Sequence, residues 1–329
     1  MQYRKLGQTD IDISVVSMGC WQIVGGDWWG AQDEADSLAA IDAALDVGIN
    51  FFDTAEGYGA GGSEEVLGKA LEARRDKAIV ATKVSRANLA ADDLRAACER
   101  SLRRLRTDYI DFYQIHWPSR DVPFEESMTV LQELKQQGKV RAIGVSNFGP
   151  QDMIDMLALG RYEGNQIPYN LLWRSPEYEI QPICVEHNIS ILPYSPLNQG
   201  LLTGKFASAD EVPDSRARTR QFASDRADAG HGEPGCEEAM FAAIDELRTI
   251  SDELERPMAH IALAWLLHQP AVDSVIAGAR NPQQVIENAA AADLTLSDDM
   301  LKRLDEITAP VKTHLGSNVD MWASESRYR

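Results

Sequence analysis

The stretch INFFDTAEGYG (Ile49–Gly59) begins as an apolar run and ends in polar side chains. Its first half, with Phe51 and Phe52, is typical of a β-strand that is buried in a core. Asp53 and Tyr58 then follow among glycines, where a strand that only fills a core would end in an ordinary turn. The stretch therefore predicts a strand whose carboxyl end presents a carboxylate and a phenol.

The pattern of this stretch repeats along the chain. Short runs of β-branched and apolar residues alternate with amphipathic segments, and we count eight strand candidates with a helix expected after each. The expected strands lie at residues 15–19, 49–53, 78–83, 109–116, 141–146, 164–168, 189–195 and 272–278. The helices that we can place lie at residues 34–47, 63–73, 91–105, 123–137, 150–159, 177–187 and 282–291.

Alternating strands and helices predict a parallel sheet, and eight such units close a (β/α)8 TIM barrel. An open doubly wound sheet would predict a G-x-G-x-x-G turn after an early strand, and the GAGG of Gly59–Gly62 lacks that spacing. We therefore expect a single barrel domain over residues 1–329. Outside the repeats we expect an N-terminal β-hairpin (1–13) that closes the barrel bottom, a long loop or lid (207–236), and a C-terminal helix (297–307) with a polar tail.

The composition narrows the possible functions. A formal net charge of -19 repels phosphate backbones, so nucleic-acid binding is not expected. The N-terminus lacks the apolar run of a signal peptide, and no apolar stretch approaches the ~20 residues that span a bilayer. The cysteines form no C-x-x-C pair, which disfavours a zinc site and a disulfide framework. These features predict a cytoplasmic protein with reduced thiols and no membrane partner.

Polar side chains gather where the expected strands end, which is where a (β/α)8 barrel has its active site. Asp53, Tyr58, Lys83 and His116 all fall at this mouth. A lysine cation lowers the pKa of a nearby phenol from about 10, and a carboxylate keeps that lysine charged and in place. Such a set suits giving a proton to a carbonyl oxygen while a coenzyme supplies hydride. Each residue alone has an ordinary structural explanation, but their joint occurrence favours catalysis.

Longer motifs carry a resemblance to a known family. They are FDTAEGYG (Phe52–Gly59), ATK (Ala81–Lys83), LRTDYIDFYQIHWP (Leu105–Pro118), GKVRAIGVSNF (Gly138–Phe148), YSPLNQGLLTGK (Tyr194–Lys205) and GARNPQQVIEN (Gly278–Asn288). In this order and spacing the chain resembles the aldo-keto reductases over roughly residues 3–307. It is most similar to the bacterial reductases that are related to the β subunits of voltage-gated potassium channels.

The resemblance implies a catalytic role for each of the four residues. Tyr58 would be the proton donor, and Lys83 would lower its pKa. Asp53 would pair with Lys83, and His116 would orient and polarise the substrate carbonyl.

The resemblance also implies a nicotinamide coenzyme along the mouth. Ser146, Asn147 and Gln166 would hydrogen-bond its carboxamide, and Tyr194 would stack on its ring. Further coenzyme contacts would come from Trp21, Ser195, Pro196, Leu197, Gly200, Leu201, Lys205, Arg216, Gly278, Arg280, Gln284, Glu287 and Asn288. Arg280 favours NADPH, because a guanidinium can bind a 2′-phosphate with two hydrogen bonds; an arginine can also stack on adenine in an NADH site.

The predicted function is NADPH-dependent reduction of an aldehyde or a ketone, with Trp28, Trp117 and Trp173 as candidate walls of a small-molecule pocket. Two alternatives stay open: an NAD(P)-dependent sugar or polyol dehydrogenase, and a non-catalytic NADP(H)-binding module that reports redox state. A metal-dependent hydrolase is disfavoured, because only His116 of six histidines lies clearly at a strand end. The tail either covers the pocket or pairs with a second subunit.

Overall fold

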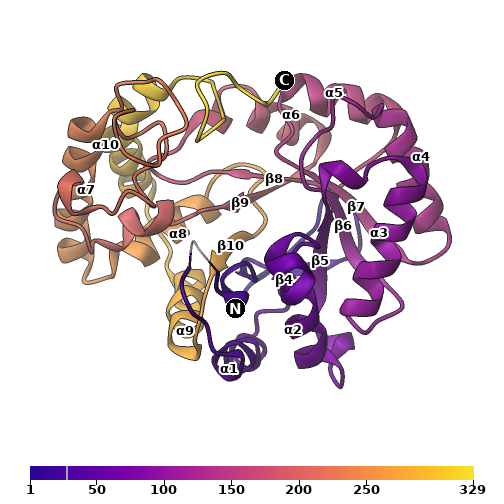
Figure 1. Cartoon of the computed structure of the whole chain (residues 1–329). Helices are drawn as coiled ribbons and strands as arrows, with labels where there is room; N and C mark the ends of the chain where they lie inside the picture. The colour runs from indigo at the N-terminus through magenta and orange to yellow at the C-terminus, as the bar shows by residue number, and fades with distance from the viewer. Residues whose placement is uncertain (27–28) are drawn as a thin grey trace.

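The computed structural model describes residues 1–26 and 29–329, and within them eight parallel strands form a sheet that curves into a barrel (Figure 1). The order along the sheet is β10, β3, β4, β5, β6, β7, β8 and β9. The ring closes beside β10, where the Ile191 N–H donates to the Ala271 carbonyl at 2.6 Å. The strands are β3 (Val16–Gly19), β4 (Phe51–Asp53), β5 (Ile79–Val84), β6 (Ile110–Ile115), β7 (Val140–Ser146), β8 (Gly164–Pro168), β9 (Ser190–Tyr194) and β10 (Val275–Gly278).

Helices alternate with these strands and pack outside the sheet, so the predicted (β/α)8 fold is confirmed (Figure 1). They are α1 (Glu34–Asp46), α2 (Gly62–Leu71), α3 (Ala91–Arg104), α4 (Phe124–Gln136), α5 (Pro150–Leu159), α6 (Ile180–His187), α7 (Glu237–Leu254), α8 (Met258–Leu267), α9 (Pro282–Ala290) and α10 (Asp298–Leu315). Within the described ranges, none of these helices is both long enough and apolar enough to cross a bilayer.

Three helices differ from the sequence prediction. The prediction placed no helix between β9 and β10, where α7 and α8 lie. Most residues of α8 are buried, so α8 has no polar face to give an amphipathic pattern. Helix α10 continues to Leu315 instead of ending at residue 307, and it contains Pro310, a residue that usually ends a helix.

A hairpin fills the amino end of the barrel. Strand β1 (Tyr3–Lys5) pairs antiparallel with β2 (Asp12–Ser14). Apolar hairpin residues share one buried cluster with inward-facing strand residues: Leu6, Ile11, Ile13, Phe51, Ala81, Phe112, Ala142, Leu192 and Ile276. A Cβ at Gly144 would lie 2.1 Å from the Phe112 ring, so β7 needs a glycine there to admit that ring. The hairpin thus closes the bottom of the barrel, as expected.

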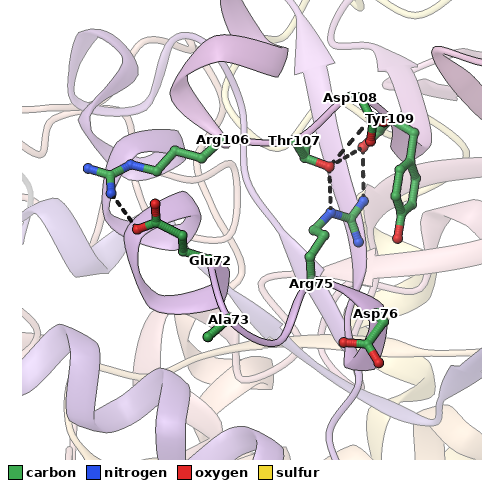
Figure 2. Close-up of a pocket in the computed structure, with 8 residues that line it drawn as sticks. All are labelled: Glu72, Ala73, Arg75, Asp76, Arg106, Thr107, Asp108 and Tyr109. Atoms are coloured by element: carbon green, nitrogen blue, oxygen red, sulfur yellow. Dashed lines mark hydrogen bonds and ion pairs between the residues drawn. The ribbon is translucent and has the colours of Figure 1, made fainter.

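A cleft of about 640 Å³ opens at this same end, between the loops that follow α2 and α3 (Figure 2). Its two arginines are paired: Arg106 donates to Glu72 at 2.7 Å, and Arg75 donates to Asp111 at 2.6 Å. The Arg75 guanidinium also lies 4.1 Å over the Tyr109 ring. In (β/α)8 barrels this end serves stability, and active sites lie at the opposite end. The cleft is therefore not the candidate active site.

The C-terminal tail lies over the carboxyl end of the barrel. After α10, residues 316–329 turn back towards α5 (Figure 1). Arg220, in the expected long loop at 207–236, donates to the carbonyls of Asn318 and Asp320 at 2.9 and 3.2 Å. At the far end of the tail, the Arg329 N–H donates to the Asp152 carboxylate of α5 at 3.2 Å. The tail therefore covers the mouth within this chain, and its pairing with a second subunit stays a prediction.

Candidate active site

The four predicted catalytic residues meet at the carboxyl ends of β4, β5 and β6. Asp53 ends β4, and Tyr58 follows it in a short 3-10 turn. Lys83 lies near the end of β5, and His116 comes directly after β6. Parallel register sets Asp53 beside the Lys83 strand, because Asp53 pairs with Ala81, two residues before the lysine. The sheet therefore brings together residues that lie far apart in sequence.

The Lys83 ammonium group uses all three of its N–H donors in this cluster. It donates to Asp53 Oδ2 at 2.8 Å, to the Thr54 carbonyl at 2.8 Å and to the Tyr58 hydroxyl at 3.3 Å. The Lys83 side chain is 0% exposed, so these contacts are shielded from water. An ammonium group has no lone pair, and the Tyr58 oxygen must therefore accept the hydrogen bond. No acceptor in the described part of the chain takes the proton of Tyr58.

Burial and charge act in opposite directions on the ionisation of this pair. Burial raises the pKa of Tyr58 above its usual value, and the Lys83 cation lowers it only in part. Burial lowers the pKa of Lys83, but Asp53 and Tyr58 together raise it by more. The pKa of Lys83 is therefore above its usual value. Lys83 lowers the pKa of Tyr58, as predicted, but burial raises that pKa by more. Tyr58 is thus a protonated donor and Lys83 a cation at neutral pH.

His116 lies beside Tyr58 as a neutral ring. The two ring centroids are 5.7 Å apart and the planes meet at 81°. Burial, together with the Lys83 cation, lowers the pKa of His116 to about 3. Neither ring nitrogen has a partner among the described residues, so one N–H is available to a bound molecule.

Two glutamines hold the second oxygen of the Asp53 carboxylate. Gln166 Nε2 donates to Asp53 Oδ1 at 2.7 Å, and Gln114 Nε2 lies 3.5 Å from the same oxygen. Gln166 was predicted to contact the coenzyme, and here its amide nitrogen donates to the Asp53 carboxylate. Gln114 was not predicted at all, although its position inside the β6 motif was a usable signal.

The residues predicted to hold the nicotinamide also lie together, around Asn147. The Asn147 amide donates to the His116 carbonyl at 2.9 Å and to Ser146 Oγ at 3.1 Å. Its oxygen accepts from the hydroxyls of Tyr194 at 2.9 Å and Tyr328 at 2.6 Å. The positive φ of Asn147, 61°, is tolerated by asparagine better than by most residues. These contacts fix Asn147 at the floor of the mouth.

The tail supplies aromatic contacts that the sequence prediction missed. Trp322 stacks on Tyr194 with centroids 6.2 Å apart and an interplanar angle of 8°. Tyr328 meets Trp117 edge to face at 5.5 Å. Arg327 lies 4.3 Å over the Trp117 ring while its guanidinium pairs with Asp320 at 2.6 Å. No motif marked these tail residues, because their role comes from a fold-back over the barrel.

The loop after β9 forms a cationic cradle. Gly200 has a φ of 96°, and a Cβ there would lie 2.5 Å from Lys205 Nζ and 3.3 Å from Arg216 Nη1. Burial and the Arg216 cation lower the pKa of Lys205. No carboxylate in the described part of the chain pairs with Lys205. Two cations that converge on a bare glycine fit a pyrophosphate, so the residues present suit the predicted coenzyme. Ser195, Pro196, Leu197 and Leu201 lie along the same loop.

The predicted adenosine residues cluster at the end of β10 and the start of α9. A Cβ at Gly278 would lie 1.8 Å from Gln22 Nε2, so a larger residue there would require the Gln22 side chain to move. Gln284 accepts from the Arg280 N–H at 2.9 Å, and Asn288 donates to the Gly278 carbonyl at 3.3 Å. Glu287 accepts from the Gln283 amide at 2.9 Å. The region is thus ordered by its own side chains.

The predicted tryptophans have different surroundings. Trp21 stacks on Tyr58 at 5.6 Å with an interplanar angle of 21°, and it is 37% exposed. Trp117 lies under the tail at the mouth. Trp173 is 0% exposed and packs beneath the Arg220 guanidinium, so it lies in the core instead of on an open wall. Trp28 lies outside the described residues.

We also searched the described ranges for metal sites and disulfide bonds. They contain no cluster of three or more His, Cys, Asp or Glu side chains that could hold a metal ion. Cys20, Cys98, Cys184 and Cys236 are buried and form no disulfide bonds.

Comparison with known proteins agrees with the fold. A model of the Aldo/keto reductase family matches residues 15–309. Aldo-keto reductase YhdN of Bacillus subtilis is 36% identical over 324 residues, which cover 93% of each chain. The NADH-specific methylglyoxal reductase of Escherichia coli is 36% identical and covers 89% of this chain and 94% of its own. A probable voltage-gated potassium channel β subunit of Arabidopsis thaliana is 28% identical, with coverages of 93% and 96%.

Two solved structures extend the comparison to three dimensions. The glycerol dehydrogenase AKR11B4 from Gluconobacter oxydans superposes with a TM-score of 0.82 at 35% identity, over 94% of this chain and 95% of that one. An aldo-keto reductase from Klebsiella pneumoniae in complex with NADPH gives a TM-score of 0.74 at 28% identity, with coverages of 94% and 96%.

Proposed function

The chain belongs to the aldo/keto reductase family, and we propose that it reduces an aldehyde or a ketone to an alcohol with Tyr58 as the proton donor. One observation carries the proposal. The Tyr58 oxygen accepts from Lys83 at 3.3 Å, so the phenol proton is not shared with the lysine, and it has no acceptor among the described residues. A general acid needs such an uncommitted proton within hydrogen-bond reach of its substrate.

Each neighbour of Tyr58 has a defined task in this reaction. Lys83 stabilises the phenolate that remains after proton transfer, because it is a buried cation at hydrogen-bond distance. Asp53 holds Lys83 charged and in position. The neutral His116 ring donates one N–H to the substrate oxygen and orients the carbonyl. Lys83 thus stabilises charge, while Asp53 and His116 position the lysine and the substrate.

The coenzyme supplies the hydride when it is bound along the mouth. Asn147 and Ser146 would position the nicotinamide end, and Lys205 with Arg216 would bind the pyrophosphate. Arg280 would meet a 2′-phosphate at the adenosine end. The NADPH complex of the Klebsiella reductase and the NADH-specific name of the Escherichia coli relative support both coenzymes as candidates.

The substrate is a small molecule with a carbonyl group. Trp21 stacks on Tyr58, and Trp117, which directly follows His116, meets Tyr328 of the tail, so both rings are candidate walls of the substrate pocket. The methylglyoxal reductase relative supports small dicarbonyl substrates. The glycerol dehydrogenase structure supports a second function, polyol oxidation, which uses the same residues in reverse.

A coenzyme absorbance assay tests the proposal. The protein is incubated with NADPH or NADH and with methylglyoxal, aromatic aldehydes, simple ketones or aldoses, and in reverse with glycerol, inositols and sugars. We expect sustained turnover on at least one carbonyl compound. Tight coenzyme binding without turnover in either direction would contradict the proposal and favour a redox-sensing module.

A further inference from the structure

The loop between β3 and α1 touches the guanidinium that a 2′-phosphate would need. Arg280 Nε donates to Gln32 Oε1 at 2.7 Å, and Arg280 Nη1 donates to the Trp29 carbonyl at 2.9 Å. Arg280 Nη2 donates to the Ala31 carbonyl. All three nitrogens of the guanidinium are therefore engaged by one short stretch of the loop, residues 29–32.

Gln32 binds Arg280 in both directions. Its amide nitrogen returns a hydrogen bond to the Arg280 carbonyl at 2.9 Å and reaches Ser37 Oγ at 3.0 Å. Ser37 is itself fixed, because its hydroxyl donates to the Ile23 carbonyl at 2.8 Å. The Gln32 amide is thus oriented from α1, with its oxygen held against the guanidinium.

The acceptors around Arg280 are all neutral. No carboxylate in residues 1–26 or 29–329 pairs with this guanidinium, although the chain carries 51 acidic residues against 32 basic ones. Arg280 also lies two residues before Pro282, the first residue of α9, where the helix dipole favours negative charge. A hydrogen bond from an arginine to a phosphate is roughly twice as strong as one between neutral groups. A 2′-phosphate can therefore compete with this neutral brace, but only by displacing it.

We propose that Gln32 sets the coenzyme preference of this protein by competing with a 2′-phosphate for Arg280. NAD(H) binds with the Gln32–Arg280 pair intact, since it has no 2′-phosphate. NADP(H) binds only after Arg280 releases Gln32 and the two loop carbonyls. The inference rests on the proposed function, because it assumes that the adenosine of a nicotinamide coenzyme lies at β10 and α9.

The same pair links coenzyme choice to the substrate pocket. The Trp29 carbonyl is one acceptor of Arg280, and the Trp29 ring meets Trp21 edge to face at 5.4 Å. Trp21 in turn covers Tyr58. Trp29 and Trp21 therefore connect Arg280 to the ring that stacks on Tyr58.

Two nearly isosteric substitutions at Gln32 test the competition in opposite directions. Gln32→Leu removes the acceptor, and we expect NADP+ to bind about 10-fold more tightly while the Kd of NAD+ changes less than about twofold. Gln32→Glu places a carboxylate on Arg280, and we expect NADP+ to bind at least about 10-fold more weakly with NAD+ again little changed. Binding is measured by calorimetry, so the readout does not depend on turnover.

Glu34→Gln is the matched control, because Glu34 lies two residues after Gln32, at the start of α1, but pairs with Lys69 instead of Arg280. It should leave the ratio of the two Kd values unchanged. A role for Gln32 in loop folding alone would shift both coenzymes together, and that result would overturn the inference. Failure of the unmodified protein to bind either coenzyme would instead overturn the proposed function.

Discussion

Asp53 at the carboxyl end of β4 and Asp111 at the amino end of β6 are both buried carboxylates that pair with basic side chains. Asp111 accepts from Arg75 and Arg141, each at 2.6 Å, and from the Val80 N–H at 2.9 Å. Arg75 is engaged on all three of its nitrogens, because it also donates to Thr107 Oγ1 and to the carbonyls of Ala78 and Tyr109. The Asp111 network is closed, and Figure 2 shows part of it, with Arg75 held by neighbouring groups.

The Asp53 network differs in one respect: it ends in a group that is not committed. Lys83 donates to both Asp53 and Tyr58, and the Tyr58 proton has no acceptor among the described residues. His116 beside it also keeps a free N–H. A buried carboxylate with basic partners is therefore a structural brace at one end of the barrel and, in the proposed reaction, part of a proton-donating site at the other. What separates them is whether the chain of hydrogen bonds closes on the protein itself.

The largest effect is expected for Lys83→Met. The substitution removes the cation that stabilises the phenolate, so kcat should fall by about 10³-fold. It also leaves the Asp53 carboxylate buried without a cation, and the free energy of unfolding should drop by about 3 kcal/mol or more. Steady-state kinetics and urea unfolding measure the two effects.

A double variant separates these two losses. Adding Asp53→Asn to Lys83→Met removes the unpaired charge, so most of the stability should return while turnover does not. Recovery of turnover in the double variant would show that Lys83 acts only through folding.

At the opposite end, Asp111→Asn should lower stability without touching catalysis. It breaks two ion pairs, but the Arg141 side chain is 41% exposed and water compensates part of the loss. We expect a drop of roughly 2 kcal/mol in the free energy of unfolding. The kcat measured on folded protein should stay within about twofold, and a loss of kcat as large as that of Lys83→Met would remove the contrast between the two ends.

The neutral state of His116 predicts a dependence of stability on pH. Its pKa is lowered from 6.5 to about 3, so the unfolded chain binds a proton in this window and the folded one does not. Stability therefore rises with pH between about 3 and 6.5 and falls as the solution is acidified through that range. Between pH 7 and pH 4, the free energy of unfolding of His116→Asn should fall by about 3 kcal/mol less than that of the parent protein. Chemical unfolding at the two pH values checks this, and parallel losses would show that His116 is charged in the folded state.

The smallest effect is expected for Tyr328→Phe in the tail. The ring still packs on Trp117, but the hydroxyl no longer donates to Asn147. We expect the KM of the coenzyme to rise about threefold to fivefold with kcat little changed, because one neutral hydrogen bond contributes about 1 kcal/mol. Tyr178→Phe is the control, since Tyr178 is 43% exposed and bonds weakly to the Lys312 carbonyl at 3.4 Å.

The sequence predicted the barrel and the four central residues for a physical reason. Each of Asp53, Lys83 and His116 lies at the end of an apolar run, and parallel strands bring such ends to one edge. The position of a residue at the end of an apolar run in the sequence therefore predicted its position at the mouth of the barrel. The residue types also predicted that Lys83 lowers the pKa of Tyr58. They could not predict that burial raises this pKa by more, because burial depends on how the folded chain packs.

The parts that escaped prediction depend on contacts between distant segments. Tyr328 reaches Asn147 only because the tail folds back over the mouth, and Gln32 reaches Arg280 only because the first loop lies against β10. No local period marks such pairs. Helix α8 escaped for another reason, since a helix that is buried on most sides has no amphipathic pattern to detect.

The central claim is that the uncommitted proton of Tyr58 makes this end of the barrel catalytic. The most direct measurement compares Tyr58→Phe with the parent protein for coenzyme binding and for turnover in the same preparation. The phenyl ring keeps its place against Trp21, so we expect an unchanged coenzyme Kd and a kcat lower by at least about 10³-fold. A variant that binds coenzyme and still turns over at the parent rate would contradict the account.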